Sequence, residues 1–189
     1  MTKDWALDPN KTLIMYFSWP AQAVKMKVLM WLEGRFPFKN LRVCGQPNYI
    51  VARNQAVKRA LAEPGRFTDF IWIDHDVEPT PSTDEFLKID ADVVGCMHDS
   101  PNPHEWAKPD VFHTAIWRCR RKVLAAIPPP WFMREYSLDG CRMLDCDCNY
   151  LRRKVLDAGF TIAHAGWAKH EHANTCYGSR YCGVEGVVT

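Results

Sequence analysis

The chain has 189 residues and a formal net charge of +2, from 24 Lys and Arg against 22 Asp and Glu. This length fits a single domain, residues 1–189, that buries most of its apolar surface without cross-links. So small a net charge predicts neither a strong electrostatic field for nucleic acid nor an acidic partner. No apolar stretch is long enough to span a bilayer, and the N-terminus lacks the pattern of a secretory signal. We therefore expect a soluble, cytoplasmic protein without a membrane span.

In the first half of the chain, apolar periodicity predicts strands that alternate with helices, which indicates α/β architecture. The predicted elements are a strand over 13–17, a helix over 21–33, a strand over 41–44 and a helix from an Asn48 cap to about residue 62. The inward stripe of that second helix is predicted as Ile50, Asn54, Val57 and Leu61. A buried amide must find hydrogen-bond partners. Asn54 therefore either bonds the backbone of a neighbouring loop or, with Arg53, reaches a ligand.

The second half continues the alternation. The predicted elements are a strand over 69–76, a short helix over 82–89 opened by a capping box, strands over 92–97 and 111–117, helices over 120–127 and 147–158, and a strand over 160–163. Residues 98–109 are predicted to form a loop, and residues from about 165 to the C-terminus a tail or lid. Together the elements predict a mixed, mostly parallel sheet flanked by helices, which is a Rossmann-like fold.

The most informative motif is Asp74-His75-Asp76 at the end of an apolar strand. Side chains alternate along a strand, so both carboxylates are expected on one face. Like charges in that arrangement repel unless a cation lies between them. Oxygen ligands suit a hard divalent cation such as Mg²⁺ or Mn²⁺. The alternative is an ordinary pair of surface carboxylates.

Two later groups could add chemistry. Asp145 or Asp147 begins a helix, where either is an N-cap or, if it faces a ligand, a general base. His164, His170 and His172 follow, and imidazole is a ligand for Mn²⁺ or Zn²⁺, although each could equally lie in a solvated tail.

The eight cysteines leave a second class of function open. Without a secretory signal, reduced thiols are favoured over disulfides. Cys141, Cys146 and Cys148, with the later histidines, Cys176 and Cys182, supply enough ligands for zinc. Their spacing matches no standard finger or ribbon. The rival hypothesis is a non-catalytic, zinc-stabilised binding module.

Taken in order, the motifs resemble those of GT-A glycosyltransferases, in particular small family-2-like enzymes of bacteriophages and bacteria. The resemblance covers about residues 13–172 and rests on Tyr49–Val57 with its Ala-Arg-Asn, Phe70–Val77 with its Asp-x-Asp, Asp92–Gly95, Arg121–Leu124 with Pro130-Trp131-Phe132, and Asp147–Leu151 with Ala158-Gly159-Phe160. Cys146 departs from the pattern, because the family has Glu there.

The resemblance implies transfer of a sugar from a nucleotide-sugar donor, with UDP-sugar favoured, to an acceptor hydroxyl, with Mn²⁺ or Mg²⁺ as cofactor. It implies that Asp74 and Asp76, with His170 or His172, hold the metal, and that Asp147 is the catalytic base. The nucleotide-sugar-binding residues would be Ser18, Pro20, Arg53, Asn54, Asp74 and His75. The acceptor-side residues would be Trp106, Trp131, Asp145 and Trp167.

The acceptor is the least determined part of the hypothesis. A modified base in phage DNA is favoured by the surplus of aromatic residues and by the basic runs at 120–122 and 152–154. In that case the enzyme would act in the host cytoplasm. A glycan or lipid acceptor is the alternative. Oligomeric state is left open.

Overall fold

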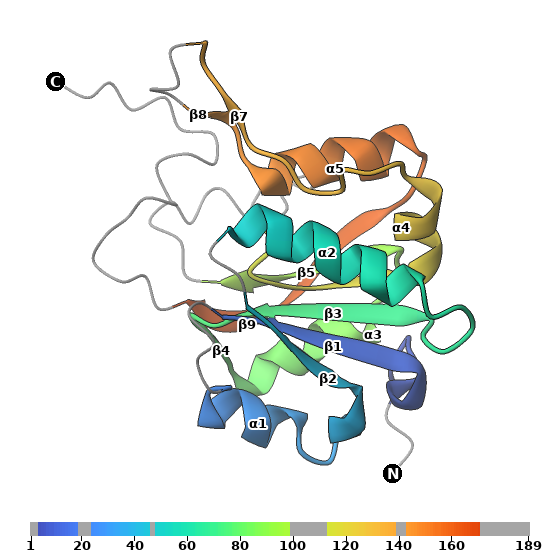
Figure 1. Cartoon of the computed structure of the whole chain (residues 1–189). Helices are drawn as coiled ribbons and strands as arrows, with labels where there is room; N and C mark the ends of the chain where they lie inside the picture. The colour runs from blue at the N-terminus through green and yellow to red at the C-terminus, as the bar shows by residue number, and fades with distance from the viewer. Residues whose placement is uncertain (1–3, 19–23, 46–47, 99–112, 139–142, 171–189) are drawn as a thin grey trace, which may run out of the picture.

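The computed structural model describes residues 4–18, 24–45, 48–98, 113–138 and 143–170. In this part of the chain a seven-stranded sheet has helices on both faces (Figure 1). The strands follow the order β2 (Leu41–Cys44), β1 (Thr12–Phe17), β3 (Asp69–Asp74), β6 (Ile116–Arg120), β5 (Val93–His98), β9 (Ile162–His170) and β4 (Val77–Pro79). A second sheet pairs β7 (Glu135–Tyr136) with β8 (Met143–Asp145).

Strand direction confirms the mixed, mostly parallel sheet. β1 runs parallel to β2 and β3, and β5 runs parallel to β9. β6 is antiparallel to both β3 and β5, and β4 is antiparallel to β9. Five strands therefore end at the same edge of the sheet, which is the edge where open α/β sheets bind ligands.

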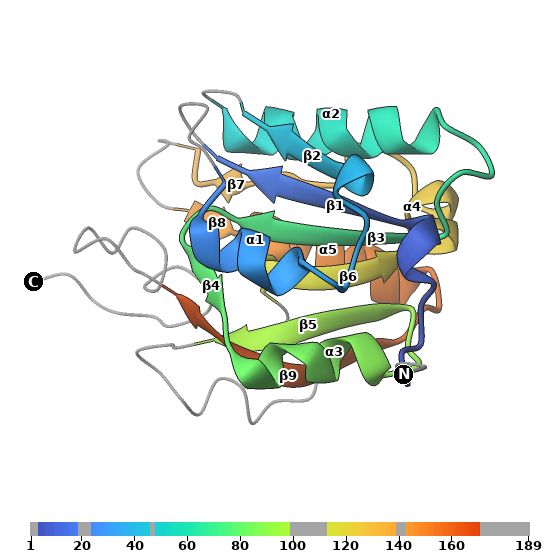
Figure 2. The same ribbon diagram turned by 90° about the horizontal axis from the view of Figure 1, so that it is seen from below.

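Two apolar cores lie on the two faces of the sheet. Figures 1 and 2 show α2 (Tyr49–Leu61), α4 (Arg121–Ala126) and α5 (Asp147–Asp157) on one face, and α1 (Met26–Leu32) and α3 (Glu85–Lys88) on the other. Alternate residues of each central strand enter alternate cores, as a pleated strand requires. On the α2 face, Trp72 and Trp117 stack with ring centroids 4.1 Å apart. Burial of both sheet faces explains the nearly continuous apolar sequence of β1 and β3.

The predicted strands and helices are found, but several boundaries were wrong. α1 begins at Met26 and not near residue 21, because Lys25 has an extended backbone (φ −56°, ψ 139°). The helix predicted over 82–89 is a 3₁₀ turn, Pro81–Asp84, followed by α3, and its capping box is formed by Thr80 with Thr83.

The largest error concerns the C-terminal strand. β9 continues to His170, so residues 165–170 are not part of a tail. The reason is a pairing that sequence does not show, since β9 lies between β5 and the short strand β4, in a segment for which no strand was predicted. At Gly166 the φ is +77° and an added Cβ would lie 2.6 Å from the Ser82 carbonyl oxygen, so this approach of β9 to the 3₁₀ turn requires glycine.

None of the described helices combines the length and the apolar character needed to cross a membrane.

Asp92 joins the beginnings of β5 and β9. Its carboxylate accepts hydrogen bonds from the Thr161 N–H and hydroxyl at 3.1 Å each and pairs with Lys122 at 2.6 Å. Partial burial raises the pKa of Asp92, but the Lys122 and Thr161 contacts outweigh it and hold the pKa below the ordinary value.

A carboxylate whose pKa is lower in the folded state stabilises the protein at pH values above its unfolded-state pKa. This contribution is lost as the pH falls through the folded-state pKa. We therefore expect Asp92→Asn to lower the free energy of unfolding by about 1 kcal/mol at pH 7, and by progressively less as pH falls below about 4. Urea unfolding at pH 7 and pH 3 measures this. The control is Asp90→Asn, at a nearby residue whose side chain is 80% exposed. This variant should change the free energy of unfolding little. A pH-independent effect would contradict the prediction.

Candidate functional site

The predicted metal-binding and catalytic residues that the structure describes, Asp74, Asp76, Asp147 and His170, gather at the edge where β1, β3, β5 and β9 end. β3 ends at Asp74, and Asp76 lies in the following turn, not on the strand as predicted, because pairing of β3 with β6 stops at Ile73. The two carboxylates are nevertheless neighbours, since the charge of Asp76 helps to raise the pKa of Asp74. β9 brings His170 to the same edge, opposite Val77 in the β4 pairing.

Arg53 is the centre of the site. It projects from α2 and is fully buried. Its Nη2 donates to both oxygens of Asp74, at 3.0 and 2.9 Å, and to the Thr114 carbonyl at 2.7 Å. Its Nη1 lies 3.5 Å from an Asp147 oxygen. One guanidinium therefore links the end of β3 to the start of α5.

Aromatic rings enclose this guanidinium. Its central carbon lies 4.2 Å from the Tyr49 ring centroid, 5.2 Å from that of Phe132 and 5.6 Å from that of Phe17. Such contacts stabilise a cation that is removed from water. Within the described residues, Nε and Nη1 of Arg53 make no hydrogen bond. The side chain thus keeps donors that an anionic ligand could use.

Asp74 is held firmly. Besides Arg53, the Tyr49 hydroxyl donates to its Oδ2 at 2.5 Å. Burial raises the pKa of Asp74 well above the ordinary value, and Asp76 and Asp147 act in the same direction against Arg53. These three hydrogen bonds occupy most of the four or so acceptor positions that a carboxylate offers. Asp74 is therefore fixed in orientation and has little capacity left for another ligand.

Asp76 is more open, with 37% of its side chain exposed. His170 Nε2 lies 3.1 Å from its Oδ2. Partial burial raises the pKa of Asp76, but the hydrogen bond and charge of His170 outweigh it, so the pKa lies below the ordinary value. His98, at the end of β5, and His113 extend this group. The His98 ring centroid lies 4.6 Å from that of His170 and 5.2 Å from that of His113.

Asp147 begins α5 and is buried. It pairs with Arg53 and with Arg134, whose Nε lies 3.1 Å from its Oδ1. Burial, with Cys148 in addition, raises the pKa of Asp147 against the opposing charges of the two arginines. Cys146 is the N-cap of α5 and accepts a long hydrogen bond from Asn149 N. The cysteine at the position where the resemblance predicts Glu therefore caps the helix.

The described residues fit a divalent cation only in part. Carboxylate oxygen and imidazole nitrogen are suitable ligands for Mn²⁺, and Asp76 and His170 are adjacent. In the described ranges, however, no three His, Cys, Asp or Glu residues form a ready-made metal site. Mg²⁺-type cations are commonly bound by one or two carboxylates together with substrate phosphates. The residues therefore fit a cation that binds with a diphosphate, and Asp76 and His170 are better placed to hold it than Asp74.

Asn54 has no capacity left for a nucleotide sugar, contrary to the role predicted for it. Its Nδ2 donates to the carbonyls of Phe132 (2.7 Å) and Ile50 (3.0 Å). Its Oδ1 accepts from the N–H groups of Trp131 (2.8 Å) and Phe132 (3.2 Å). All four amide positions are therefore used by backbone. The first of the two alternatives, a bond to a neighbouring loop, is the correct one.

The predicted acceptor-side residues do not form one wall. Trp131 is buried in the α2-face core, and its Nε1 donates to the Leu124 carbonyl at 2.9 Å, which contradicts the acceptor role. Asp145 is buried and pairs with Arg153 at 2.6 Å. Trp167 is half-buried within β9. Trp106 lies outside the described residues.

Of the remaining predicted site residues, the structure describes some and not others. Ser18 is buried at the end of β1, and its N–H donates to the Cys44 carbonyl. His75 is half-buried beside Asp76. Pro20 and His172 lie outside the described residues, so His170 is the one of the two late histidines that the structure places. The structure shows no disulfide between any two of the described cysteines, which are Cys44, Cys96, Cys119, Cys146 and Cys148.

Sequence reasoning missed several site residues. Tyr49 and Arg134 contact Asp74 and Asp147 directly. The Tyr49 position could have been found, because it precedes Arg53 by one helical turn and side chains four residues apart share a face. Arg134, His98 and His113 lie in or beside segments whose path the sequence does not reveal.

Comparisons with known proteins concern the fold. The structure is similar to that of A197 from STIV, with a TM-score of 0.51 and 14% identity over 84% of this chain and 81% of that chain. At this identity the similarity shows a shared fold alone.

Two other solved structures match more distantly. One is a glycosyltransferase involved in the glycosylation of the major capsid of PBCV-1, with a TM-score of 0.39 and 12% identity over 60% of this chain and 62% of that chain. The other is the inositol-1-phosphate CTP transferase from T. maritima, with a TM-score of 0.44 and 10% identity over 93% of this chain and 95% of that chain. No protein-family model and no curated protein matches the chain.

The hydrogen bonds of Asn54 make a prediction about stability. Asn54→Ala should lower the free energy of unfolding by about 2–3 kcal/mol, because the buried N–H groups of Trp131 and Phe132 lose their acceptor. Chemical denaturation measures the change. Lys58→Ala, on the exposed side of the same helix, is the control and should stay within about 0.5 kcal/mol of the parent. A stable Asn54→Ala protein would restore the ligand hypothesis.

Proposed function

We propose that the protein is a metal-dependent glycosyltransferase that moves a sugar from a nucleotide sugar, with UDP-sugar favoured, to an acceptor hydroxyl. One observation carries the proposal. Carboxylates from the end of β3 and the start of α5 pair with a single buried arginine, and the carboxylate in the turn after β3 lies beside the imidazole that ends β9. This arrangement lies at the sheet edge where α/β folds bind ligands.

The donor diphosphate would lie over Asp76 and His170. These two residues would hold Mn²⁺ or Mg²⁺, which neutralises the negative charge that develops on a leaving diphosphate. Asp74 orients Arg53 and is itself oriented by Tyr49. Nε and Nη1 of Arg53 are buried and make no hydrogen bond within the described residues, so a phosphate or ribose oxygen that reached the guanidinium would find unused donors.

Asp147 is the proposed base. Its buried carboxylate has a raised pKa, which suits proton acceptance near neutral pH. Arg53 places it next to Asp74, whereas Asp145 is directed to Arg153. This contact supports the choice of Asp147 over Asp145. Arg134 would position the base and is not itself proposed to react.

The aromatic surplus and the two basic runs had favoured DNA as the acceptor, but residues of both make contacts within the protein. In the basic runs, Arg121 donates to the Ala60 and Leu61 carbonyls, and Lys122 pairs with Asp92. Arg153 and Lys154 bind Asp145 and the 128–130 carbonyls in the same way. Trp72 and Trp117 stack in the core. A DNA acceptor therefore keeps no support from these residues, and a glycan or lipid hydroxyl is an equal candidate.

The metal assignment predicts the effect of Asp76→Asn. A thermal-shift screen of nucleotide sugars with Mn²⁺ should first identify a donor, because a ligand of the native state raises its stability. Asp76→Asn should then weaken Mn²⁺-dependent binding of that donor by at least ~10-fold in calorimetry. The control is Glu78→Gln, an acidic residue two positions later that pairs with Lys27. Unchanged Mn²⁺-dependent binding in Asp76→Asn would refute the metal role.

The base assignment predicts a different pattern. Asp147→Asn should reduce turnover of the identified donor by roughly 10²–10⁴-fold with donor affinity unchanged. Asp145→Asn is the matched control, because it removes a buried, arginine-paired carboxylate at the same helix end. Loss of donor binding in Asp147→Asn would show that the residue positions Arg53 and does not transfer the proton.

A further inference from the structure

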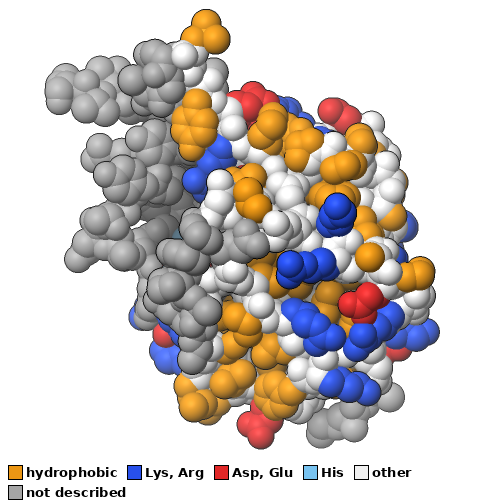
Figure 3. All heavy atoms as spheres, viewed as in Figure 1, with side chains coloured by type: hydrophobic (Ala, Val, Ile, Leu, Met, Phe, Trp, Pro, Cys, Tyr) orange, Lys and Arg blue, Asp and Glu red, His pale blue; other side chains and the backbone are white. Residues whose placement is uncertain are grey.

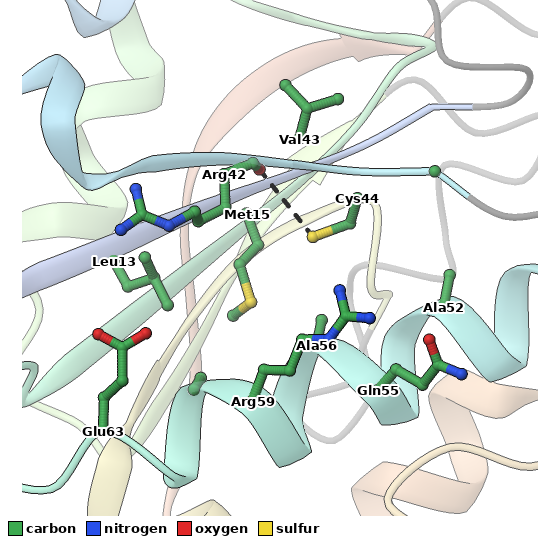
Figure 4. Close-up of a pocket in the computed structure, with 12 residues that line it drawn as sticks. Leu13, Met15, Arg42, Val43, Cys44, Ala52, Gln55, Ala56, Arg59 and Glu63 are labelled. Atoms are coloured by element: carbon green, nitrogen blue, oxygen red, sulfur yellow. Dashed lines mark hydrogen bonds between the residues drawn. The ribbon is translucent and has the colours of Figure 1, made fainter.

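A groove separate from the site runs between the edge strand β2 and helix α2, with a volume of about 240 Å³ (Figure 4). Leu13 and Met15 of β1 form its floor, and Arg42 and Cys44 of β2 form one wall. Among the strands that the structure describes, β2 is the outermost of the sheet and pairs with β1 alone. The groove is therefore open to solvent along the sheet edge.

The opposite wall explains why space remains there. Ala52, Ala56 and Ala60 follow one another at four-residue intervals on α2, so their methyl groups share the side that faces β2. These short side chains span about 12 Å of helix and cannot reach the strand. The result is a narrow apolar channel with a length close to that of a short alkyl chain.

Two arginines, Arg42 and Arg59, line this groove, and both act electrostatically on the Cys44 thiol between them. Their guanidinium groups differ. Arg42 Nη1 donates to the carbonyls of Lys39 and Leu41 at 2.7 and 3.1 Å, and Figure 4 shows this guanidinium turned away from that of Arg59.

The Arg59 side chain rises from α2 toward β2 (Figure 4). Within the described residues, Arg59 makes no side-chain hydrogen bond or ion pair. The one carboxylate of the lining, Glu63, is paired with Arg66 at 2.6 Å.

The surrounding surface has the same sign. Lys and Arg side chains gather over α2 and β2 on the face shown in Figure 3. An apolar floor alone would suit any hydrophobic group, and cationic side chains alone would suit any anion. Their combination in one narrow channel selects a molecule with both properties.

We propose that the β2–α2 groove binds a small amphiphilic anion, with an unbranched apolar body along the alanine wall and a carboxylate or phosphate head at Arg59. Burial of the apolar body supplies most of the affinity. The Arg59 guanidinium supplies the preference for a charged head, because it can donate two parallel hydrogen bonds to a carboxylate or phosphate. The groove and the proposed transferase site share helix α2 but no side chain.

The test uses the full chain with octanoate as the probe and methyl-labelled methionine as the reporter. Met15 is buried and lines the groove, so its methyl resonance should shift on titration with octanoate, while those of the exposed Met26 and Met30 should not. Acetate should leave Met15 unchanged, and octanol should bind about fivefold more weakly than octanoate. Equal shifts at all three methionines, or equal binding of octanol and octanoate, would overturn the proposal.

Matched variants locate the head group. Arg59→Gln should weaken octanoate binding about fivefold and remove the preference over octanol. Lys58→Gln removes the same charge from the next exposed residue of α2, which does not line the groove, and should bind octanoate as the parent does. Equal weakening of octanoate binding in both variants would show that it comes from general surface charge, which would refute the site.

A third variant tests the apolar channel. Ala56→Leu should abolish octanoate binding because the larger side chain projects from the alanine wall and fills the channel. A thermal unfolding transition like that of the parent shows that the variant is folded. The Arg59 and Lys58 pair decides the proposal independently of that result. None of these residues contacts Asp74, Asp76 or Asp147, so failure here leaves the proposed transferase activity untouched.

Discussion

The burial of Arg53 is the constraint on which the site depends. A guanidinium removed from water is stable only if charges and hydrogen-bond acceptors surround it. Here Asp74, Asp147 and the Thr114 carbonyl provide them, and three aromatic rings close the remaining sides. These partners come from β3, from α5 and from the segment before β6. Loss of any one of them would leave a buried charge less than fully paired, so α2, the end of β3 and the start of α5 are tied to a common geometry.

Helix α2 has two different sides because of this constraint. One side carries Arg53 into the site and Asn54 to the 131–132 backbone, and both residues are held by several hydrogen bonds. The side that faces β2 carries three alanines at four-residue intervals, with Gln55 and Arg59 beside them, and leaves a groove. A helix fixed so firmly on one side does not need large side chains on the other to stay in place. The groove can therefore persist without collapse of β2 onto α2.

The sequence predicted most elements of the fold, because apolar alternation in β1 and β3 and helical periodicity in α2 and α5 are local properties. It failed where a long-range pairing decides the outcome. β9 is longer than predicted because β4 pairs with its last residues, and Gly166, typical of a loop, is there required by close approach to the 3₁₀ turn. In the site, the Asp-x-Asp motif and Asp147 could be found from spacing. The role of Asn54 could not, because it depends on carbonyl and N–H groups of the 131–132 segment, far away in sequence. The burial of Trp131 could not either, because it depends on how the turn after α4 folds back to give the indole the Leu124 carbonyl.

The two aspartates of the motif differ more than their symmetrical spacing indicates. Asp74 accepts three hydrogen bonds from protein and is 14% exposed, whereas Asp76 has one imidazole beside it and is 37% exposed. Asp74 therefore fixes the geometry, and Asp76 with His170 remains accessible to a ligand. A site that offers a cation only two ready ligands binds it weakly until phosphate oxygens complete the coordination. In the proposed reaction, that incompleteness would make metal binding depend on the donor, so the charge needed for departure of the diphosphate would be present mainly when a diphosphate is bound.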